Sequence, residues 1–271
     1  MGVKQQIDDA IFLFENGRYI GGLTNALLAA AGSSRKMFPK ATTKSIKYPG
    51  KEMGDGEAFE LFLRTSDQRA KFEDGVPLNA GHSMVALPFR GKQLTIEHIL
   101  YKYYRCHLAH QSELPSDVEF DPSHNGNGAR IDFQDNKLIL DAGWLKILID
   151  KVVNSPVNGP EFGITHYGLD PVAPNEEEFK SLLCEKRNIT PGHFEILQLA
   201  ARALSPEKIS QSNDQMLKRD FKDIVQREVI NGGMLGGLRS RQIVNDSFDL
   251  TDRGAEILRE VAAGYKLVRI S

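Results

Sequence analysis

One short stretch of the chain, YKYYRCHLAHQSELP at residues 101–115, concentrates side chains that are capable of acid–base chemistry. It places Arg105, Cys106, His107 and His110 within six residues, in a chain that has only seven histidines. An imidazole titrates near pH ~6.5 and can therefore take or give a proton at neutral pH. A guanidinium can hold two phosphate oxygens through its planar fork. Together these groups suit proton transfer beside a phosphate.

Cleavage of RNA by its own 2′-hydroxyl is a reaction that uses such groups without a metal. We expect His110 to take the hydroxyl proton and Arg105 to stabilise the extra charge of the phosphorane. His107 is the neighbour of His110 at i−3, and Glu113 at i+3 is either an orienting carboxylate or a surface acid at the helix end. On an ideal helix, Arg105 and His110 lie about 140° apart, so they converge only if the helix is distorted or the arginine reaches around it.

Metal and cofactor chemistry is poorly supported by the sequence. Cys106, His107 and His110 could ligate a metal, but no second cluster supplies further ligands, and Cys184 is remote. Neither a GxxxxGK[ST] loop nor a GxGxxG loop occurs. We therefore predict no metal and no cofactor.

Composition limits the class of protein. A chain of 271 residues with 41% hydrophobic residues can bury a core and is long enough for two modest domains. Its two distant cysteines offer no disulfide framework, and its apolar runs are shorter than the ~20 residues of a membrane span. We expect a cytoplasmic protein without a membrane partner. The formal net charge of −2 gives no global attraction to nucleic acid.

Any such attraction must come from local basic patches, and the chain has two. Residues 35–51 contain six basic side chains and no acid, and residues 218–241 have an excess of three basic over acidic side chains. Each patch is a candidate phosphate-binding surface or simply a solvated one. The candidate contacts are Arg35, Lys36, Lys40, Lys44 and Lys47 in the first patch, and Lys218, Arg219, Lys222, Arg239 and Arg241 in the second.

Hydrophobic periodicity predicts the elements that position the 101–115 stretch. Helical spacing indicates helices over about residues 7–14, 18–38 and 57–72, and a further helix that Thr95 caps and that must stop before Pro115. The period then changes to two, which predicts a small antiparallel meander from strands at 118–120, 129–133 and 137–140, followed by a helix at 142–153. The fold class is mainly α with small β.

A stretch rich in proline and glycine, residues 154–175, marks the best domain boundary. We therefore predict a helical domain over 1–154, a linker over 155–176 and a second domain over 177–271. In the second domain we expect helices at 176–186, 190–203 and 214–230, a β-hairpin of 238–244 with 248–250, and a last helix at 251–262. That order is typical of a winged helix.

The stretch LRSRQIVNDSFDLTDRGAEILREV resembles winged helix-turn-helix domains, in which a basic wing leads into an LTxxG helix start. Leu250, Thr251 and Gly254 match that start. The resemblance implies DNA contacts from the helix that carries Lys218, Arg219 and Lys222 and from the wing that carries Arg239 and Arg241. The alternative is a domain that only packs or dimerises.

The spacing R-x4-H on a long helix after a two-helix hairpin resembles the HEPN superfamily. LPFRGKQLTIEHILYKYYRCHLAHQSELP is similar to a group of bacterial HEPN-like proteins, and the resemblance covers about residues 3–115. It implies a helical bundle and a metal-independent endoribonuclease, as in toxins and defence effectors, with one composite site between two protomers. We also expect the apolar stripe of the motif helix to pack against a second copy. The alternative is a non-catalytic protein that binds nucleic acid or a protein partner, with R-x4-H as a structural feature.

Overall fold

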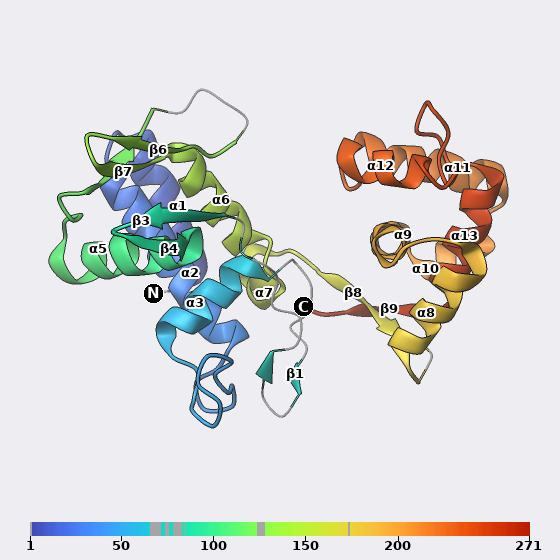
Figure 1. Ribbon diagram of the computed structural model, residues 1–271, viewed down its shortest axis with the longest axis horizontal. Coiled ribbons are helices and arrows are strands. Elements are labelled where there is room, and N and C mark those ends of the chain that lie inside the picture. The colour runs from blue at the N-terminus through green and yellow to red at the C-terminus, as the bar shows by residue number, and fades with distance from the viewer. Residues whose placement is uncertain are drawn as a thin grey trace. The chain divides into compact units, whose positions relative to one another are not determined.

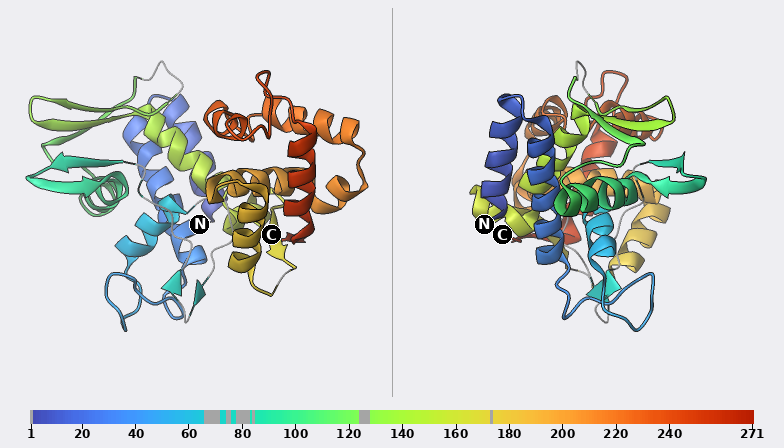
Figure 2. Two further views of the ribbon diagram at one scale, coloured as in Figure 1. Left: turned by 45° about the vertical axis from the view of Figure 1, so that its right-hand side comes forward. Right: turned by 90° about the vertical axis from the view of Figure 1, so that its left-hand side faces the viewer.

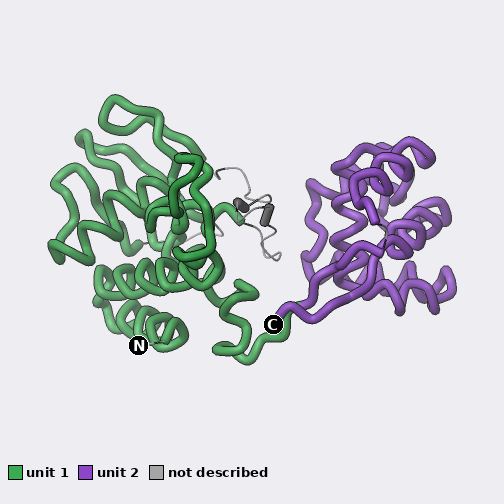
Figure 3. The backbone as a smooth tube through the Cα atoms, turned by 90° about the horizontal axis from the view of Figure 1, so that it is seen from below, with its two compact units in different colours: residues 1–166, 271 green, residues 167–270 purple. Residues whose placement is uncertain are grey.

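The computed structural model describes residues 2–65, 72–73, 76–77, 83, 85–123, 128–172 and 174–271. It divides into two compact units, residues 1–166 with residue 271 and residues 167–270 (Figure 3). The units are mainly helical with small sheets, which confirms the predicted class. Within the described residues, no helix combines the length and apolar composition needed to cross a membrane.

Unit 1 is built on a hairpin of α1 (Val3–Glu15) and α2 (Tyr19–Met37), which run side by side (Figures 1 and 2). The helices approach closely at Gly22, where a Cβ would lie 2.8 Å from the carbonyl oxygen of Ala10. The other face of α2 contacts α3 (Asp55–Arg64) and α6 (Ala142–Val153). The third predicted helix ends earlier than expected, at Arg64, because Thr65 is extended, with φ −67° and ψ 126°. Residues 72–73 form β1, which pairs with β2 (Val76–Pro77). Residues 66–71, the rest of that prediction, lie outside the described residues.

The R-x4-H stretch lies on one continuous helix made of α4 (Ile96–Ile99), a π-helical turn η1 (Leu100–Arg105) and α5 (Cys106–Gln111). Thr95 caps its start as predicted, and Ser112 ends it in the left-handed conformation, with φ 60°. The apolar stripe of this helix is buried in the core of unit 1, so the expectation that the stripe needs a second copy is wrong. Ile96, Ile99 and Leu100 of the stripe are buried, and Tyr103 is half-buried against the same core, where Tyr104 and Leu108 are buried as well.

Two small sheets flank this helix. The first is the hairpin of β3 (Ala86–Phe89) and β4 (Lys92–Thr95). The second has the order β5-β7-β6, from β5 (Val118–Asp121), β6 (Ile131–Gln134) and β7 (Lys137–Asp141). Asp135 and Asn136, with φ 50° and 63°, make the tight turn between β6 and β7, which are antiparallel as predicted. The predicted antiparallel meander is wrong for β5, which adds to the free edge of β7 and runs parallel to it.

The segment predicted as a linker is divided between the two units. Its first half holds η2 (Pro156–Asn158) and α7 (Gly159–Phe162), and it is fixed in unit 1 by the buried Asn158. The Asn158 amide donates to Ser33 Oγ at 2.8 Å and to the Val152 carbonyl at 2.9 Å. The second half forms β8 (Tyr167–Pro171), which pairs with β9 (Tyr265–Arg269) in unit 2.

Unit 2 packs five helices around α9 (Pro191–Leu204). These are α8 (Glu176–Arg187), α10 (Pro206–Gln211), α11 (Asp214–Gln226), α12 (Gly232–Arg239) and α13 (Asp252–Ala263). The starts of α8, α9 and α13 are those predicted, and Thr190 and Thr251 cap α9 and α13 through their side chains.

The predicted wing hairpin does not form as two strands. Residues 238–239 belong to α12, and only Val244 and Leu250 pair, as an isolated antiparallel bridge. The helix α12 forms because Asn231 caps it by accepting from Met234 N at 3.1 Å, and because Leu235 and Leu238 bury one face. The helix predicted over 214–230 ends at Gln226.

Candidate functional site

Arg105 ends the π-helical turn and lies over the ring of Tyr101, with its guanidinium carbon 5.7 Å from the ring centroid. Its Nε is buried and has no hydrogen-bond partner among the described residues. Tyr101 in turn packs on Gly56, where a Cβ would lie 2.8 Å from the ring. Arg105 is therefore held in place by an aromatic ring while it keeps an unused hydrogen-bond donor.

The histidines face other neighbours. His107 Nδ1 lies 2.6 Å from Gln111 Oε1. The pKa of Asp117 is held below its ordinary value first by hydrogen bonds from Arg90 and, among weaker causes, by the nearby His107. His110 and Glu113 are exposed. No hydrogen bond within the described residues joins Arg105 to His110.

Cys106, the next residue on the helix, is half-buried beside Tyr101. Burial, and then the adjacent Cys106, raise the pKa of the Tyr101 hydroxyl, whereas Arg105 lowers it. Across the described ranges, no three histidine, cysteine or acidic side chains gather in a way that could hold a metal ion.

A cluster of opposite charges lies next to Arg105, at the start of α3. The Nε of Arg35 donates to Asp55 Oδ1 at 2.7 Å, and its Nη2 contacts the same oxygen. The Nη1 of Arg35 also donates to the Phe38 carbonyl, and its Nη2 donates to the Met53 carbonyl. The hydrogen bond from Arg35, with further help from Lys40 and Arg105, holds the pKa of Asp55 below its ordinary value. These three cations therefore all lie within Coulombic reach of one carboxylate.

The rest of the first basic patch is partly engaged in ion pairs. Lys36 pairs with Glu161 and also donates to Asn158 Oδ1 at 3.1 Å, and Lys47 pairs with Glu60. Lys40 and Lys44 are exposed, and no ion pair of the described residues involves them. The patch thus offers fewer available cations than its sequence indicates.

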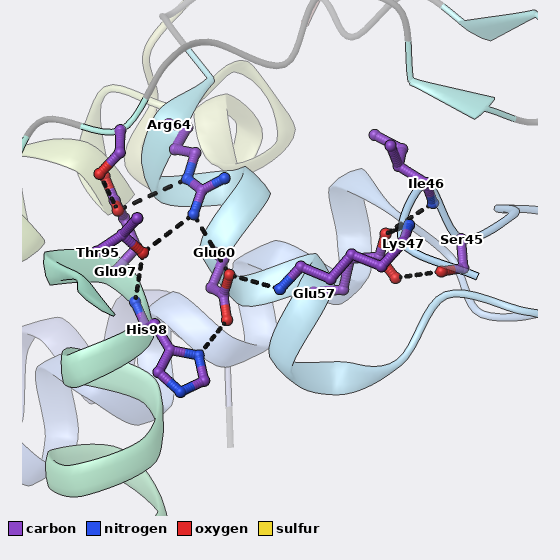
Figure 4. Close-up of polar contacts among 10 residues, drawn as sticks. Ser45, Ile46, Lys47, Glu57, Glu60, Arg64, Thr95, Glu97 and His98 are labelled. Carbon is purple, nitrogen blue, oxygen red and sulfur yellow. Dashed lines mark hydrogen bonds and ion pairs between the residues drawn. The ribbon is translucent and has the colours of Figure 1, made fainter. Parts of the chain in front are cut away.

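A buried polar network, which the sequence did not predict, lies on the opposite end of α3 (Figure 4). Glu60, with a side chain that is 5% exposed, accepts hydrogen bonds from Lys47 Nζ at 2.9 Å, His98 Nδ1 at 2.8 Å and Arg64 Nη2 at 3.3 Å. An ionised carboxylate only accepts, so the network assigns the proton of His98 to Nδ1. Burial raises the pKa of Glu60, but the bonds from Lys47 and His98 outweigh it, and the pKa lies below its ordinary value.

Two further buried carboxylates extend this network. Glu97 is fully buried and pairs with Arg64 Nε at 3.6 Å. Glu57 accepts from Ser45 Oγ and from the backbone N–H groups of Ile46 and Lys47, and so fixes the loop before α3 (Figure 4). The sequence held a signal for these residues, because Glu60 and Glu97 each interrupt an apolar run, FELFL and TIEHIL. A charge inside such a run indicates a buried ion pair.

In unit 2 the predicted DNA-contacting side chains are mostly paired with acids. Lys218 pairs with Asp252, Lys222 with Asp249 and Arg239 with Asp246. Arg219 pairs with Asp220, whereas Arg241 donates to an amide oxygen, Asn188 Oδ1, at 3.4 Å. Of these five cations, only Arg239 lines a shallow hollow of about 560 Å³ at the start of α13. It is lined by Arg239, Gln242, Val244, Asn245, Asp246, Thr251, Asp252 and Arg253.

Comparison with known proteins identifies a family for the N-terminal part of the chain. The model of the Rv1289 family matches residues 2–173, more than half of the sequence, and the chain therefore belongs to this family. The match includes the described residues of unit 1 up to residue 166 and extends to β8. No curated protein matches the chain, and no solved structure does.

Proposed function

We propose that this member of the Rv1289 family is a metal-independent endoribonuclease that uses Arg105 and His110. The observation that carries the proposal is the state of Arg105, a cation fixed on Tyr101 whose buried Nε has no acceptor within the described part of the chain. A phosphate oxygen would supply that acceptor once the side chain turns to expose the nitrogen. The π-helical turn that ends at Arg105 adds support, because such turns occur often at functional sites.

The reaction needs only groups that the helix carries. His110 takes the proton from the ribose 2′-hydroxyl as its oxygen attacks phosphorus, and the guanidinium of Arg105 stabilises the added charge. The new bond joins the 2′-oxygen to phosphorus, and the bond to the 5′-oxygen breaks. The leaving 5′-oxygen takes a proton, for which His107 is the nearest second imidazole. The products are a 2′,3′-cyclic phosphate and a 5′-hydroxyl.

The proposal includes a homodimer, because Arg105 and His110 lie about 140° apart around an ideal helix and no hydrogen bond within the described residues joins them. In a two-fold arrangement, His110 of one protomer faces Arg105 of its partner, and the same contact repeats across the axis. The exposed end of α5 is free to make this contact, whereas the apolar stripe is already buried. Light scattering at micromolar concentration should give twice the monomer mass, and a monomer at all concentrations would contradict the composite site.

A second function, non-catalytic binding of nucleic acid or a protein partner, is favoured by one specific observation. The stacking of Arg105 on Tyr101 and its proximity to Asp55 are also what a structural arginine would show. In this alternative, unit 2 binds DNA or a protein through the surface around Arg239 and Arg241. The acids paired with its cations would have to be displaced by DNA phosphates, and ion pairs this exposed are weak enough to allow that.

One experiment separates the two functions. Full-length protein is incubated with single-stranded RNA in the presence of a metal chelator, and the ends of the fragments are analysed. The endoribonuclease should leave 2′,3′-cyclic phosphates, and His110→Ala should lower the rate by about 10²- to 10⁴-fold, the contribution of a positioned proton acceptor. Lys102→Ala, a change at an exposed residue of the same helix, is the matched control and should cut at the wild-type rate.

The outcome that supports the alternative is equally definite. If the wild type leaves RNA intact, and Arg105→Ala mainly lowers the melting temperature of unit 1, the motif has a structural role. Arg105→Lys sharpens this result, because lysine keeps the charge but loses the fork that grips a phosphate. A catalytic arginine should therefore tolerate lysine poorly in the cleavage assay while the fold is retained.

A further inference from the structure

The charge cluster at the start of α3 is unbalanced. Arg35 donates hydrogen bonds to Asp55, and Arg105 lies over Tyr101, whose ring packs on Gly56, the residue after Asp55. Arg35, Lys40 and Arg105 all lower the pKa of this single carboxylate. The Asp55 side chain is 69% exposed, so water reaches the carboxylate while it is held by Arg35. Three cations beside one exposed carboxylate leave a local excess of positive charge that attracts a second anion.

The cations are positioned independently of Asp55. Arg35 is 25% exposed and also donates to the carbonyls of Phe38 at 3.3 Å and Met53 at 3.2 Å, so it keeps its place if the carboxylate moves away. Arg105 is held by Tyr101, which is itself packed on Gly56. Lys40 is exposed and can reach toward an incoming anion. The two arginines therefore keep their positions without their present counter-ion, and Lys40 adds a third, adjustable cation.

We infer that Arg35, Lys40 and Arg105 form a binding site for a phosphoryl group, and that Asp55 is a resident counter-ion which the phosphoryl group displaces. The inference deepens the proposed function and rests on it in one respect, namely that the natural source of the phosphoryl group is RNA. The forks of both arginines supply the donors that a tetrahedral oxyanion needs.

The chemistry of the site sets the class of ligand. A phosphoryl group carries one or two negative charges and several acceptor oxygens, so it can use three cations at once, whereas a single carboxylate cannot. The half-buried ring of Tyr101 closes the side of the site beneath Arg105. Arg35 and Lys40 belong to the first basic patch, residues 35–51. The other cations of this patch offer the RNA backbone further contacts beyond the bound phosphate.

The inference is tested by titrating the full-length protein with inorganic phosphate at low salt and following heat or backbone NMR shifts. Asp55→Asn removes the competing charge and should raise the affinity for phosphate by about tenfold. Asp8→Asn is the matched control, because Asp8 forms an exposed ion pair with Lys4 in the same unit and should leave the affinity unchanged. If Asp55→Asn leaves phosphate affinity unchanged or lowers it, the counter-ion role is wrong.

Lys40→Ala keeps the test independent of folding, because Lys40 is exposed. It should lower phosphate affinity several-fold, and an unchanged affinity would contradict the site. A second titration with a single-stranded RNA oligomer distinguishes the source of the phosphoryl group. If RNA competes with phosphate, the site takes a phosphodiester. If phosphate binds as expected but RNA neither competes nor is cleaved, the site binds free phosphate. That result supports the phosphoryl site and refutes only the endoribonuclease proposal.

Discussion

The buried carboxylate of Glu60 should contribute more to the stability of unit 1 than any exposed ion pair of that unit. The substitution Glu60→Gln keeps the size of the side chain and removes its charge. It leaves Lys47, Arg64 and His98 facing an amide that can accept at one oxygen only. The substitution therefore tests the network in Figure 4 without opening a cavity.

The expected loss in free energy of unfolding depends on how exposed Glu60 and each of its partners are. Breaking a buried ion pair by removing one partner costs about 3–5 kcal/mol. Glu60 is 5% exposed, but Lys47 is 48% and His98 36% exposed, so both can recover hydration. Arg64 keeps its bond to Thr95 Oγ1 at 3.1 Å. We therefore expect Glu60→Gln to lower the free energy of unfolding of unit 1 by about 2–4 kcal/mol at pH 7.

The loss should depend on pH in a definite direction. The pKa of Glu60 is lower in the folded chain than its ordinary value, 4.5. The folded state thus binds this proton less readily than the unfolded chain, and the stabilisation is complete above about pH 4.5. It disappears as the pH falls through the folded pKa. The difference between wild type and Glu60→Gln should accordingly shrink toward zero in acid.

The single tryptophan gives a probe for this unit alone. Trp144 lies on α6 with 4% exposure in the core of unit 1, so its fluorescence during urea unfolding reports that unit. The control is Glu119→Gln, which breaks the exposed pair with Lys137 and should cost less than about 0.5 kcal/mol. A loss below about 1 kcal/mol for Glu60→Gln at pH 7, or an equal loss at pH 7 and pH 3, would refute the reasoning.

Two predictions concern unit 2. Hydrogen bonds from Arg187 lower the pKa of Glu260 from 4.5 to about 2, so Glu260→Gln should destabilise α13 by about 1–2 kcal/mol at pH 7, allowing for solvent screening. The effect should fade as the pH drops from 4.5 toward 2, and hydrogen exchange of the α13 amides at pH 7 and in acid measures it. Gly254→Ala should lower the free energy of unfolding of unit 2 by about 1–3 kcal/mol or more, because the new Cβ would lie 2.1 Å from the Ile243 carbonyl oxygen. The control Gly236→Ala, in open space on α12, should raise it by about 0.5–1 kcal/mol. Thermal melting by circular dichroism compares the two variants, and equal melting temperatures would contradict the close approach at Gly254.

The sequence predicted most helices because apolar side chains at helical spacing and capping residues act locally. The hairpin of α1 and α2 and the caps at Thr95, Thr190 and Thr251 all follow from neighbours in the chain. The helix α12 was not predicted, because four of its eight residues are glycines. Burial of Leu235 and Leu238 and the cap at Asn231 outweigh the low helix propensity of glycine, and that burial depends on tertiary contacts.

The strand directions were harder to predict for a related reason. The turn at Asp135 and Asn136 sets the antiparallel pairing of β6 with β7, and such a turn is visible in the sequence. The pairing of β5 with β7 joins residues about 20 positions apart and carries no local signal. The same holds for β8, which pairs with β9 near the other end of unit 2. Long-range partners are chosen by which edge is open after the helices have packed.

In the candidate site, too, the sequence does not show which side chains surround each charged group. The spacing of Arg105 and His110 predicted two groups on one helix, and the structure places both there. What each group can do depends on neighbours that the spacing does not contain. Tyr101 and Asp55 surround the arginine, whereas Gln111 and Asp117 lie near His107. Arg105 ends the π-helical turn, and His107 and His110 follow on α5, so the cleavage assay and the measurement of oligomeric state together test whether one composite site uses both sets of neighbours.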